Sequence, residues 1–581
     1  NSFPTRRSSD LSVVIFQTGS LFRTIGSSTP AFSGRTYADY ELDFVFAASV
    51  SGAAPVSIDN LTVTSGTLNF NMTADPGHSV KGNITVAAGA ALNFAPADPG
   101  GTVNLNGTSV QTISGGGTIT AGSFSTLVLN NPAGVVLNTN ASLHNLTVST
   151  GRVFTINGGR NLTVAGALTN NAGNTGLVIL DGGSLIHSTV FVSATMERFF
   201  SGSRQWRLVS SPVALQAISG PWTPTTPGYD FYAWDEAVAT WRNQKVTMNQ
   251  ITDFQFGSGY LVSFEGADLT QSFAGPLNSG GISVSVGRAN TGIYAGANLL
   301  GNPYPSSIDW NLADRSLFAD NFAYIYDPAA GGGGGYVTVN GGAAGAHIAP
   351  NQGFFVIKRD MGNASFAFTN AMRTHGGVFK NASADPTITL TLQQGEFYDL
   401  AEIVQLQDAT TARERSDALK FISFNPLMPQ VFSMSSDAVQ LAVNSTGPIK
   451  EDASFSIGVL TPVAGTYTLK VEGLQEILAG RPAFLLDKVT GLSHNLREQS
   501  HISFHAVQSS TAVERFILTF AQPASVGNLP VDATLVYFAN GMLHMQFPTE
   551  EPNRRLQVID LSGRVVLSKN LEGMGSAVSV P

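Results

Sequence analysis

Asn60-Leu61-Thr62-Val63 is the first of four similar tetrapeptides that decide the fold of the N-terminal third of this 581-residue chain. The other copies are Asn83-Ile84-Thr85-Val86, Asn145-Leu146-Thr147-Val148 and Asn161-Leu162-Thr163-Val164. The first two lie 23 residues apart, and the second and third lie 62 residues apart, which we interpret as about three turns of similar length. Such a period is typical of a solenoid whose turns each supply a few short strands. Residues 12–190 are therefore predicted to form a parallel β-solenoid.

The turns of such a solenoid depend on one another, because a single turn cannot bury its apolar face alone. Leu, Val and Ile of stacked turns are expected to form a continuous core, with Thr on the solvent side of each strand. Gly and Asn are expected at the corners, where the backbone takes left-handed angles. The last two tetrapeptides, however, are only 16 residues apart. A sandwich of several hairpins therefore stays open as the alternative fold for this region.

Few ionisable side chains occur in the solenoid region. Between Ser51 and Val190 there is no Glu, and the acidic and basic residues are Asp59, Asp75, Asp98, Asp181, Lys81, Arg152 and Arg160. Two of the aspartates belong to Asp-Pro-Gly turns, where Asp hydrogen-bonds its own backbone. Solenoid enzymes that cleave acidic polysaccharides need a cluster of carboxylates and bases on one face. The region therefore predicts a spacer or an adhesive stalk.

The composition of the whole chain indicates several all-β domains. Charged residues make up 12%, hydrophobic residues make up 43%, and 61 residues are Gly, a balance typical of short strands joined by tight turns. The net charge of -9 comes with no long run of Lys or Arg, so no nucleic-acid partner is expected. With 0 Cys the chain has neither a disulfide framework nor a thiolate metal site. No apolar run reaches the roughly 18 residues of a transmembrane segment.

All 5 Trp residues lie in the segment 191–378, which we predict to be a jelly-roll-like β module. Two of them, Trp234 and Trp241, fall on the strands of a predicted hairpin formed by residues 231–236 and 240–243. Because sugar rings stack on flat indole faces, this pair is the candidate carbohydrate-binding site for surface glycans. The alternative is that both rings pack in the core or flank the hairpin, as cross-strand aromatic residues usually do.

A second block of the same segment carries a resemblance. Gly301-Asn302-Pro303-Tyr304-Pro305-Ser306-Ser307-Ile308-Asp309-Trp310 resembles part of a jelly-roll-like module that recurs beside solenoids in exported Bacteroidota proteins. The resemblance implies a β fold and no assigned chemistry. Asp235-Glu236 is expected to be a solvated turn, because adjacent strand residues point to opposite faces. The run Gly331–Gly335 is expected to be a mobile loop, and it lacks the strand-to-helix spacing of a phosphate cradle.

Residues 379–525 are predicted to form a β-sandwich from spaced strands with alternating faces. The segment resembles a module that commonly precedes a bacterial sorting domain, and the matching pieces are Gly465-x-Tyr467-x-Leu469 and an Arg-Phe-x-Leu-x-Phe end strand. The most charged stretch, residues 409–420, is expected to be a solvated connection. His501 and His505 share one face of a strand. Because no third ligand lies near them in the sequence, they are interpreted as structural and no metal site is predicted.

The last segment, residues 526–581, contains two predicted hairpins. One places strand-forming residues on both sides of Asn540-Gly541, as in a two-residue primed turn. The other turns at Asp560-Leu561-Ser562-Gly563-Arg564, between two strands. These features, with Asp560, Gly563 and Arg564 as the motif residues, resemble the C-terminal sorting domain of proteins exported by the type IX (Por) secretion system of Bacteroidota. The resemblance implies an Ig-like fold, the secretion machinery as a partner, and a location outside the cell or on the outer-membrane surface.

Both ends of the sequence are interpreted as unnatural. Residues 1–11 resemble the translation of a sequencing adapter at the edge of a metagenomic read, and we exclude them from the fold. The chain stops at Val580-Pro581, before the final strands that a sorting domain would add. We therefore expect a fragment that is truncated at both ends and whose signal peptide is missing because of the truncation.

These observations predict a non-catalytic, exported cell-surface protein that acts as an adhesin-like component or a structural stalk. No catalytic residue, cofactor-binding residue or metal ligand is predicted, and Ser210-Ser211 lacks the Gly-x-Ser-x-Gly elbow of a hydrolase. Two alternatives stay open. The first is a carbohydrate-binding module of a polysaccharide-handling protein, and the second is the non-catalytic remainder of an enzyme whose catalytic domain lies upstream.

Overall fold

The chain is all-β in the part that the computed structural model describes, with strands β1 to β50 and one five-residue helix, α1 (Leu474–Leu478). It divides into two compact units, of which the first comprises residues 1–318, 323–325 and 339–381, and the second comprises residues 319–322, 326–338 and 382–581. The described residues are 14–26, 32–52, 54–72, 77–94, 101–122, 125–289, 291–292, 294–376, 386–478, 481–521, 534–539, 542–547, 554–559, 563–571 and 577–580. The predicted adapter-like segment 1–11 lies outside them.

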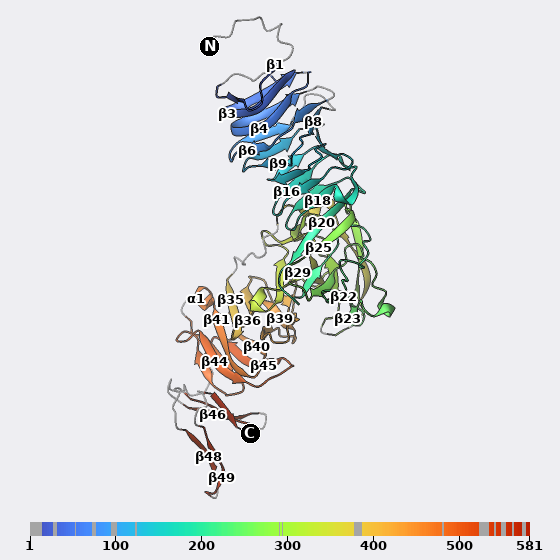
Figure 1. The fold of residues 1–581 in the computed structure, drawn as a ribbon. Helices are drawn as coiled ribbons and strands as arrows, with labels where there is room; N and C mark the ends of the chain where they lie inside the picture. Colours follow the sequence, from blue (N-terminus) through green and yellow to red (C-terminus); the bar gives the residue numbers. More distant parts are fainter. Residues whose placement is uncertain are drawn as a thin grey trace. The chain divides into compact units, whose positions relative to one another are not determined.

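The first unit begins with a β-solenoid built from three ladders of parallel strands, whose stacked turns are visible in Figure 1. Two long strands, β3 (Arg35–Gly52) and β4 (Ser57–Met72), each pass through all three ladders. The first ladder adds β1 (Val14–Ile15), β5 (His78–Val80), β8 (Thr102–Leu105), β11 (Thr126–Leu129), β14 (Asn145–Val148) and β17 (Leu168–Asn170). The second adds β2 (Leu21–Thr24), β6 (Ile84–Val86), β9 (Gln111–Ser114), β12 (Val135–Asn138), β15 (Phe154–Ile156), β18 (Leu177–Ile179) and β20 (Ser193–Phe200). The third adds β7 (Ala91–Phe94), β10 (Thr118–Ala121), β13 (Ala141–Leu143), β16 (Asn161–Val164) and β19 (Ser184–His187).

The ladders confirm the predicted solenoid and explain its irregular period. Leu61 pairs with Ile84 in the second ladder, so the 23-residue offset is one turn. Leu146 stands in the first ladder and Leu162 in the third, so the 16-residue offset is a step from one side of the solenoid to another. The 62-residue offset runs from β6 in the second ladder to β14 in the first, so it covers a little less than the three turns that we predicted. The alternative of stacked hairpins is excluded because these strands pair in parallel.

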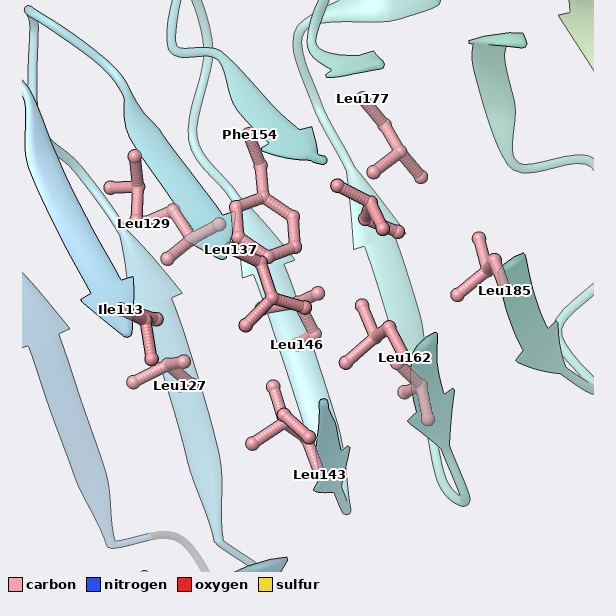
Figure 2. Packing of buried hydrophobic residues seen from close by; sticks show 14 of the residues in the cluster. Ile113, Leu127, Leu129, Leu137, Leu143, Leu146, Phe154, Leu162, Leu177 and Leu185 are labelled. Carbon is pink, nitrogen blue, oxygen red and sulfur yellow. The ribbon is translucent and has the colours of Figure 1, made fainter. Parts of the chain in front are cut away.

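The interior of the solenoid is a continuous apolar column. In each tetrapeptide the second and fourth residues are buried, whereas the Asn and Thr point outward. Figure 2 shows buried side chains from successive turns of this column, such as Leu127 and Leu146 in one ladder and Phe154 and Leu177 in another. Each fully buried Leu contributes about 1.5–3 kcal/mol relative to exposure. Because every turn supplies such residues to its neighbours, the stack is stable only as a whole.

The Asn residues of the tetrapeptides do not adopt the left-handed backbone angles that we predicted for them. None of the four has a positive φ. Instead, Asn60 Oδ1 accepts a hydrogen bond of 2.8 Å from the backbone N–H of Asn83, one turn further along. Asn83 Oδ1 in turn accepts one of 2.8 Å from the N–H of Thr112. Left-handed corners are formed by Gly, as at Gly115 (φ +113), where a Cβ would lie 1.9 Å from the carbonyl oxygen of Val86.

The hydrophobic core continues across residue 190 into the Trp-bearing part of the first unit. Strand β20 pairs in parallel with β18 of the solenoid and antiparallel with β25 (Leu269–Pro276). A sheet of four strands follows, in the order β21 (Arg207–Val209), β24 (Tyr260–Phe264), β22 (Tyr229–Asp235) and β23 (Thr240–Asn243). Further strands are β27 (Ala297–Gly301), β32 (Gly353–Ile357), β29 (Phe322–Asp327) and β30 (Gly335–Asn340) in one sheet. Strand β26 (Ile282–Arg288) pairs with β33 (Gly362–Phe368), and β28 (Ser307–Asp309) pairs with β31 (His347–Ile348) and β34 (Arg373–Thr374).

The second unit contains the predicted sandwich-like β fold. Its main sheet follows the order β43-β42-β45-β40-β38-β39-β36-β35-β41-β44, and β37 pairs with β39. Most neighbours are antiparallel, but β36 and β39 are parallel. The bounds are β35 (Thr387–Gln394), β36 (Phe397–Gln405), β37 (Ala418–Leu419), β38 (Gln430–Met434), β39 (Gln440–Thr446), β40 (Ser454–Leu460), β41 (Gly465–Glu472), β42 (Phe484–Asp487), β43 (Ser493–Asn495), β44 (His501–Ala506) and β45 (Val513–Thr519).

The C-terminal segment forms the two hairpins expected from its sequence. Strands β46 (Leu535–Ala539) and β47 (Met542–Gln546) pair so that Ala539 faces Met542, and β50 (Ala577–Val580) joins β47. Strands β48 (Arg555–Ile559) and β49 (Val565–Asn570) form the second hairpin. The turn residues Asn540-Gly541 and the motif residue Asp560 lie outside the described residues.

Two expectations for loops need correction. Residues 409–416 are exposed or half-buried, but the end of the predicted solvated connection 409–420 is not solvated, because Asp417 and Lys420 are 1% and 6% exposed. The Gly331–Gly335 run is packed rather than free. Gly331 takes φ +63, and a Cβ there would lie 2.0 Å from the carbonyl oxygen of Tyr398. Only Gly combines that backbone angle with so close an approach.

Candidate functional site

The hairpin of β22 and β23 brings the two predicted glycan-binding residues together. Trp234 and Trp241 are directly opposite each other across the strands, and both are half-buried. Their ring centroids lie 5.1 Å apart with an angle of 68° between the ring planes. Phe355 of β32 completes an edge-to-face trio, with centroids 5.4 Å from Trp234 and 5.9 Å from Trp241.

This geometry limits what the pair can offer to a sugar. The indole N–H of Trp234 donates to the backbone carbonyl of Ala297 at 2.6 Å, which fixes that ring against β27. Rings at 68° cannot form one flat platform, whereas edge-to-face packing is a favourable contact between aromatic side chains themselves. The trio therefore holds the hairpin against β27 and β32. Trp241 lies nearer the edge of its sheet than Trp234, because β23 is the last strand in the sheet order.

The carboxylates beside this hairpin have separate structural tasks. Asp235 accepts from the backbone N–H of Ala237 at 3.1 Å and lies 3.5 Å from Arg242. Glu236 is not the solvated turn residue that we expected. Its carboxylate accepts from the backbone N–H of Ala289 at 3.0 Å and from that of Gly296 at 2.8 Å. Glu236 therefore clamps the loop that leads into β27.

The Gly-Asn-Pro-Tyr-Pro block, residues 301–305, forms a buried network of hydrogen bonds to the main chain. Asn302, which is 0% exposed, donates through Nδ2 to the carbonyls of Ser306 and Ala349 at 2.8 and 2.9 Å. Its Oδ1 accepts from the N–H of Tyr304 at 3.1 Å. The hydroxyl of Tyr304 donates to the carbonyl of Gly280 at 2.6 Å. The buried side-chain amide of Asn302 supplies hydrogen-bond partners for several buried main-chain groups and thereby fixes the turn. This structural role explains why the block contains an Asn.

A cluster at the end of the solenoid that contains the buried His187 and the half-buried His375 was not predicted. His375 hydrogen-bonds the hydroxyls of Thr163 and Ser184, each at 2.8 Å, through its two ring nitrogens. Arg373 donates to the carbonyl of His187, and neither ring nitrogen of His187 has a partner among the described residues. Burial lowers the pKa of His187 and of His375 to about 4. The cluster brings together residues about 190 positions apart in the sequence, so no local pattern announces it.

Possible metal and nucleophile sites do not gather from the predicted residues. His501 and His505 lie on the same face of β44, with His501 exposed and His505 half-buried. Within the described part of the chain, no group of three or more His, Cys, Asp or Glu side chains could hold a metal ion. The Ser210 hydroxyl donates to the carbonyl of Asn302 at 2.8 Å, and the Ser211 hydroxyl donates to that of Val213 at 3.0 Å. Both serines are thus committed to main-chain carbonyls.

The described motif residues of the C-terminal hairpins lie in a tight turn. Gly563 has φ +85, a left-handed angle that a Gly adopts without strain. Arg564 follows it and is exposed, next to the first residue of β49. Asp560, the third motif residue, is outside the described residues, so its contacts are not part of this geometry. None of the described helices is long and apolar enough to span a bilayer.

The second unit contains its own set of buried charges, which sequence inspection did not single out. Arg515 and Asp487 form a two-pronged ion pair at 3.1 and 2.9 Å, and both side chains are buried. Lys420 and Asp399 pair at 2.5 Å. Burial raises the pKa of Asp417 to about 6, although the N–H groups of Ser445 and Glu414 donate to it. The only sequence signal for these groups is the charged stretch 409–420 inside an otherwise apolar strand pattern.

Comparison with known proteins gives one similarity. A family model described as a domain of unknown function (DUF8693) matches residues 123–327. The match begins just before β11 of the solenoid and ends with β29, so it spans the point at residue 190 across which the core is continuous. No curated protein and no solved structure matches the chain.

Proposed function

We propose that this chain is a non-catalytic part of an exported cell-surface protein, in which the solenoid serves as a stalk or adhesin-like scaffold. The observation that carries the proposal is the outer face of the third ladder. There Asn69 Nδ2 donates to Ser49 Oγ, Asn93 Nδ2 donates to Asn69 Oδ1, and Thr120 Oγ1 donates to Asn93 Oδ1, each at 3.3 Å. Polar side chains that bond from turn to turn stiffen the stack.

The ionisable groups also support a structural role. A general base works best with a pKa near the operating pH, whereas burial holds the pKa of His187 and of His375 near 4. The buried carboxylates of Asp487 and Asp399 are paired with cations. The paired aspartates and His375 join separate segments of the chain, which supports a structural role for them.

We further propose delivery by a type IX secretion system of Bacteroidota. Support comes from the two C-terminal hairpins and from the left-handed Gly563 at the turn of the second one. The proposal rests on the resemblance of this segment to sorting domains, and the secretion machinery would be its partner.

Expression of the complete parent gene in a Bacteroidota host tests the surface location and the proposed route of delivery. We expect protease added to intact cells to degrade the protein in a host with a working type IX apparatus, and to leave it intact in a strain that lacks the apparatus. Permeabilised cells of the second strain provide the control that the protein is present. Protection from protease in both strains would refute surface delivery.

Capture of surface glycans is the second candidate, favoured by the half-buried position of Trp241 on a strand at the end of its sheet order. A titration with a broad oligosaccharide panel, followed by Trp fluorescence, tests it. A signal that arises from sugar contact with Trp241 should be lost in Trp241→Phe. A signal that remains in this variant would come from the other Trp residues, such as the fully buried Trp222 and Trp310, and would not report binding at Trp241. If no oligosaccharide shifts the emission of the parent chain, the glycan hypothesis fails.

A further inference from the structure

The Lys420–Asp399 pair of the second unit has the arrangement of two groups held ready to react with each other. Lys420 follows β37 and Asp399 lies in β36, and their side chains are only 5% and 15% exposed. The Nζ of Lys420 lies 2.5 Å from Oδ2 of Asp399. It also donates to the backbone carbonyl of Leu400 at 3.2 Å, so its position is fixed from two sides.

The carboxylate is held equally firmly. Its Oδ2 accepts a hydrogen bond of 2.6 Å from the backbone N–H of Val431 in β38. Because Oδ2 is bonded to Cγ, a nitrogen at this distance is close to the ~3–3.5 Å separation at which reacting atoms are poised for attack. The N–H of Val431 points at the oxygen on which negative charge would develop, which is the role of an oxyanion-hole donor.

Burial favours the covalent product over the ion pair. An ammonium and a carboxylate that leave water lose several kcal/mol of solvation each, and a buried pair recovers this only in part. In water an ion pair resists condensation because both ions are well solvated. At this site most of the solvation is already lost, because the side chains of Lys420 and Asp399 are 5% and 15% exposed. A neutral amide has no comparable desolvation penalty.

We propose that Lys420 and Asp399 form an intramolecular isopeptide bond. The Nζ attacks Cγ of Asp399, the new N–C bond forms, and the C–Oδ1 bond breaks. The departing oxygen takes two protons, both supplied by the ammonium group, and leaves as water. Charges cancel within the pair, so the step needs neither an oxidant nor an added reagent. The product is an amide whose oxygen keeps the hydrogen bond from Val431.

Such a bond would close a covalent ring around the stretch 399–420 and tie β36 to the segment after β37. The inference goes beyond the proposed function, and it does not depend on export or on surface location. It gives a chain with 0 Cys a crosslink that reduction cannot break. A crosslink stabilises a fold mainly because it reduces the conformational entropy of the unfolded chain.

The intact mass of the purified full chain tests the proposal. We expect a mass lower than that of the sequence by one water molecule, trypsin cleavage after Lys420 to be lost, and a branched peptide that contains both Lys420 and Asp399. The pair Lys470–Glu472 is the internal control, because its side chains lie 2.8 Å apart but are both 49% exposed. Peptides with Lys470 should stay unmodified.

Lys420→Arg is the matched variant, because arginine keeps the charge opposite Asp399 but forms no amide there. Its intact mass should equal that of its sequence. The proposal is overturned if the parent chain has its full sequence mass and is cut by trypsin after Lys420. It is equally overturned if the Lys420→Arg variant still loses a water molecule, because the loss would then arise elsewhere in the chain.

Discussion

Along most of the solenoid of the first unit, uncharged amides and hydroxyls join neighbouring turns, and ion pairs such as Arg23–Glu41 and Arg198–Asp181 occur towards its two ends. The second unit, by contrast, joins some of its strands through buried ions. Asn60 and Asn83 bond to the main chain of the next turn in the solenoid. In the second unit Arg515–Asp487 and Lys420–Asp399 are withdrawn from water. A repetitive stack can offer every turn the same short amide, but a ladder of like charges would repel itself. A fold of unlike strands can give each ion one opposite partner.

The largest effect is expected where a buried ion loses its partner. Asp487→Ala leaves the guanidinium of Arg515 buried without its carboxylate, so the second unit should lose about 3–5 kcal/mol in its free energy of unfolding. Urea unfolding followed by circular dichroism measures the loss. Glu514→Ala is the control, because Glu514 lies 3.8 Å from Lys488 in an exposed pair, and it should cost less than about 1 kcal/mol. Equal effects of the two variants would break the contrast.

In the solenoid the largest losses should come from the apolar column instead. Leu146 is 0% exposed, so Leu146→Ala should destabilise the first unit by about 3 kcal/mol through lost burial and a cavity. The neighbouring Thr147→Ala faces outward and should change stability by about 0.5 kcal/mol or less. Thermal unfolding of both variants measures the difference. A solenoid that tolerates Leu146→Ala as well as Thr147→Ala would not depend on its interior packing.

Two buried groups, one in each unit, should respond in opposite directions to acid. The pKa of His187 is lowered by burial from 6.5 to about 4, so between these values the unfolded state binds more protons and stability falls as the pH falls. At pH 5 the loss for His187 is about 2 kcal/mol relative to pH 7. Asp417 of the second unit has a raised pKa of about 6, so the folded state binds the extra proton and that group adds stability as the pH falls from 6 towards 4.

Unfolding midpoints of the parent chain and of His187→Leu, measured from pH 7 to pH 4.5, test this difference. The variant should lose part of the acid sensitivity of the first unit and leave the transition of the second unit unchanged. Burial is the largest cause of the lowered pKa of His187, and Leu places an apolar side chain that does not titrate at this buried position. An identical pH dependence in parent and variant would show that His187 is not the sensitive group.

The smallest effect concerns a single rung of the amide ladder. Asn83→Ala removes the acceptor for the N–H of Thr112 and should cost about 1 kcal/mol. Asn83→Asp keeps an acceptor oxygen at the same place and should recover most of that loss at low salt. Hydrogen exchange at Thr112 reports the bond directly, and it should quicken in the first variant only. Unchanged exchange in Asn83→Ala would mean that the bond does not form in solution.

Much of this architecture could be predicted from the sequence, because it rests on local patterns. Alternating Leu and Val in the tetrapeptides identified the solenoid strands and their inward faces, and Trp234 and Trp241 were placed on the two strands of one hairpin. The register of the solenoid could not be obtained from the repeats alone. The same tetrapeptide stands in different ladders, since Leu146 and Leu162 occupy different sides of the stack.

The candidate sites show the same division. Pairing of Trp234 with Trp241 follows from hairpin geometry, but the edge-to-face contact with Phe355 depends on a strand more than a hundred residues away. Glu236 was misjudged because its partners, the N–H groups of Ala289 and Gly296, come from a distant loop. The burial of Asp417 and Lys420 was missed because charge in a sequence normally indicates exposure to solvent.

By itself the sequence determined the strands, their apolar faces, the absence of thiol chemistry and the shortage of charges in the solenoid. Those properties depend on side-chain periodicity and composition, which the chain carries in every conformation. Tertiary structure alone decided which His side chains have a pKa lowered by burial and which ions pair in the interior. It also decided that Lys420 and Asp399 lie at hydrogen-bonding distance from each other. The physical reason is that the solvation of a side chain and its distance from a partner depend on neighbouring residues. Those neighbours come together only when distant segments of the chain pack against one another.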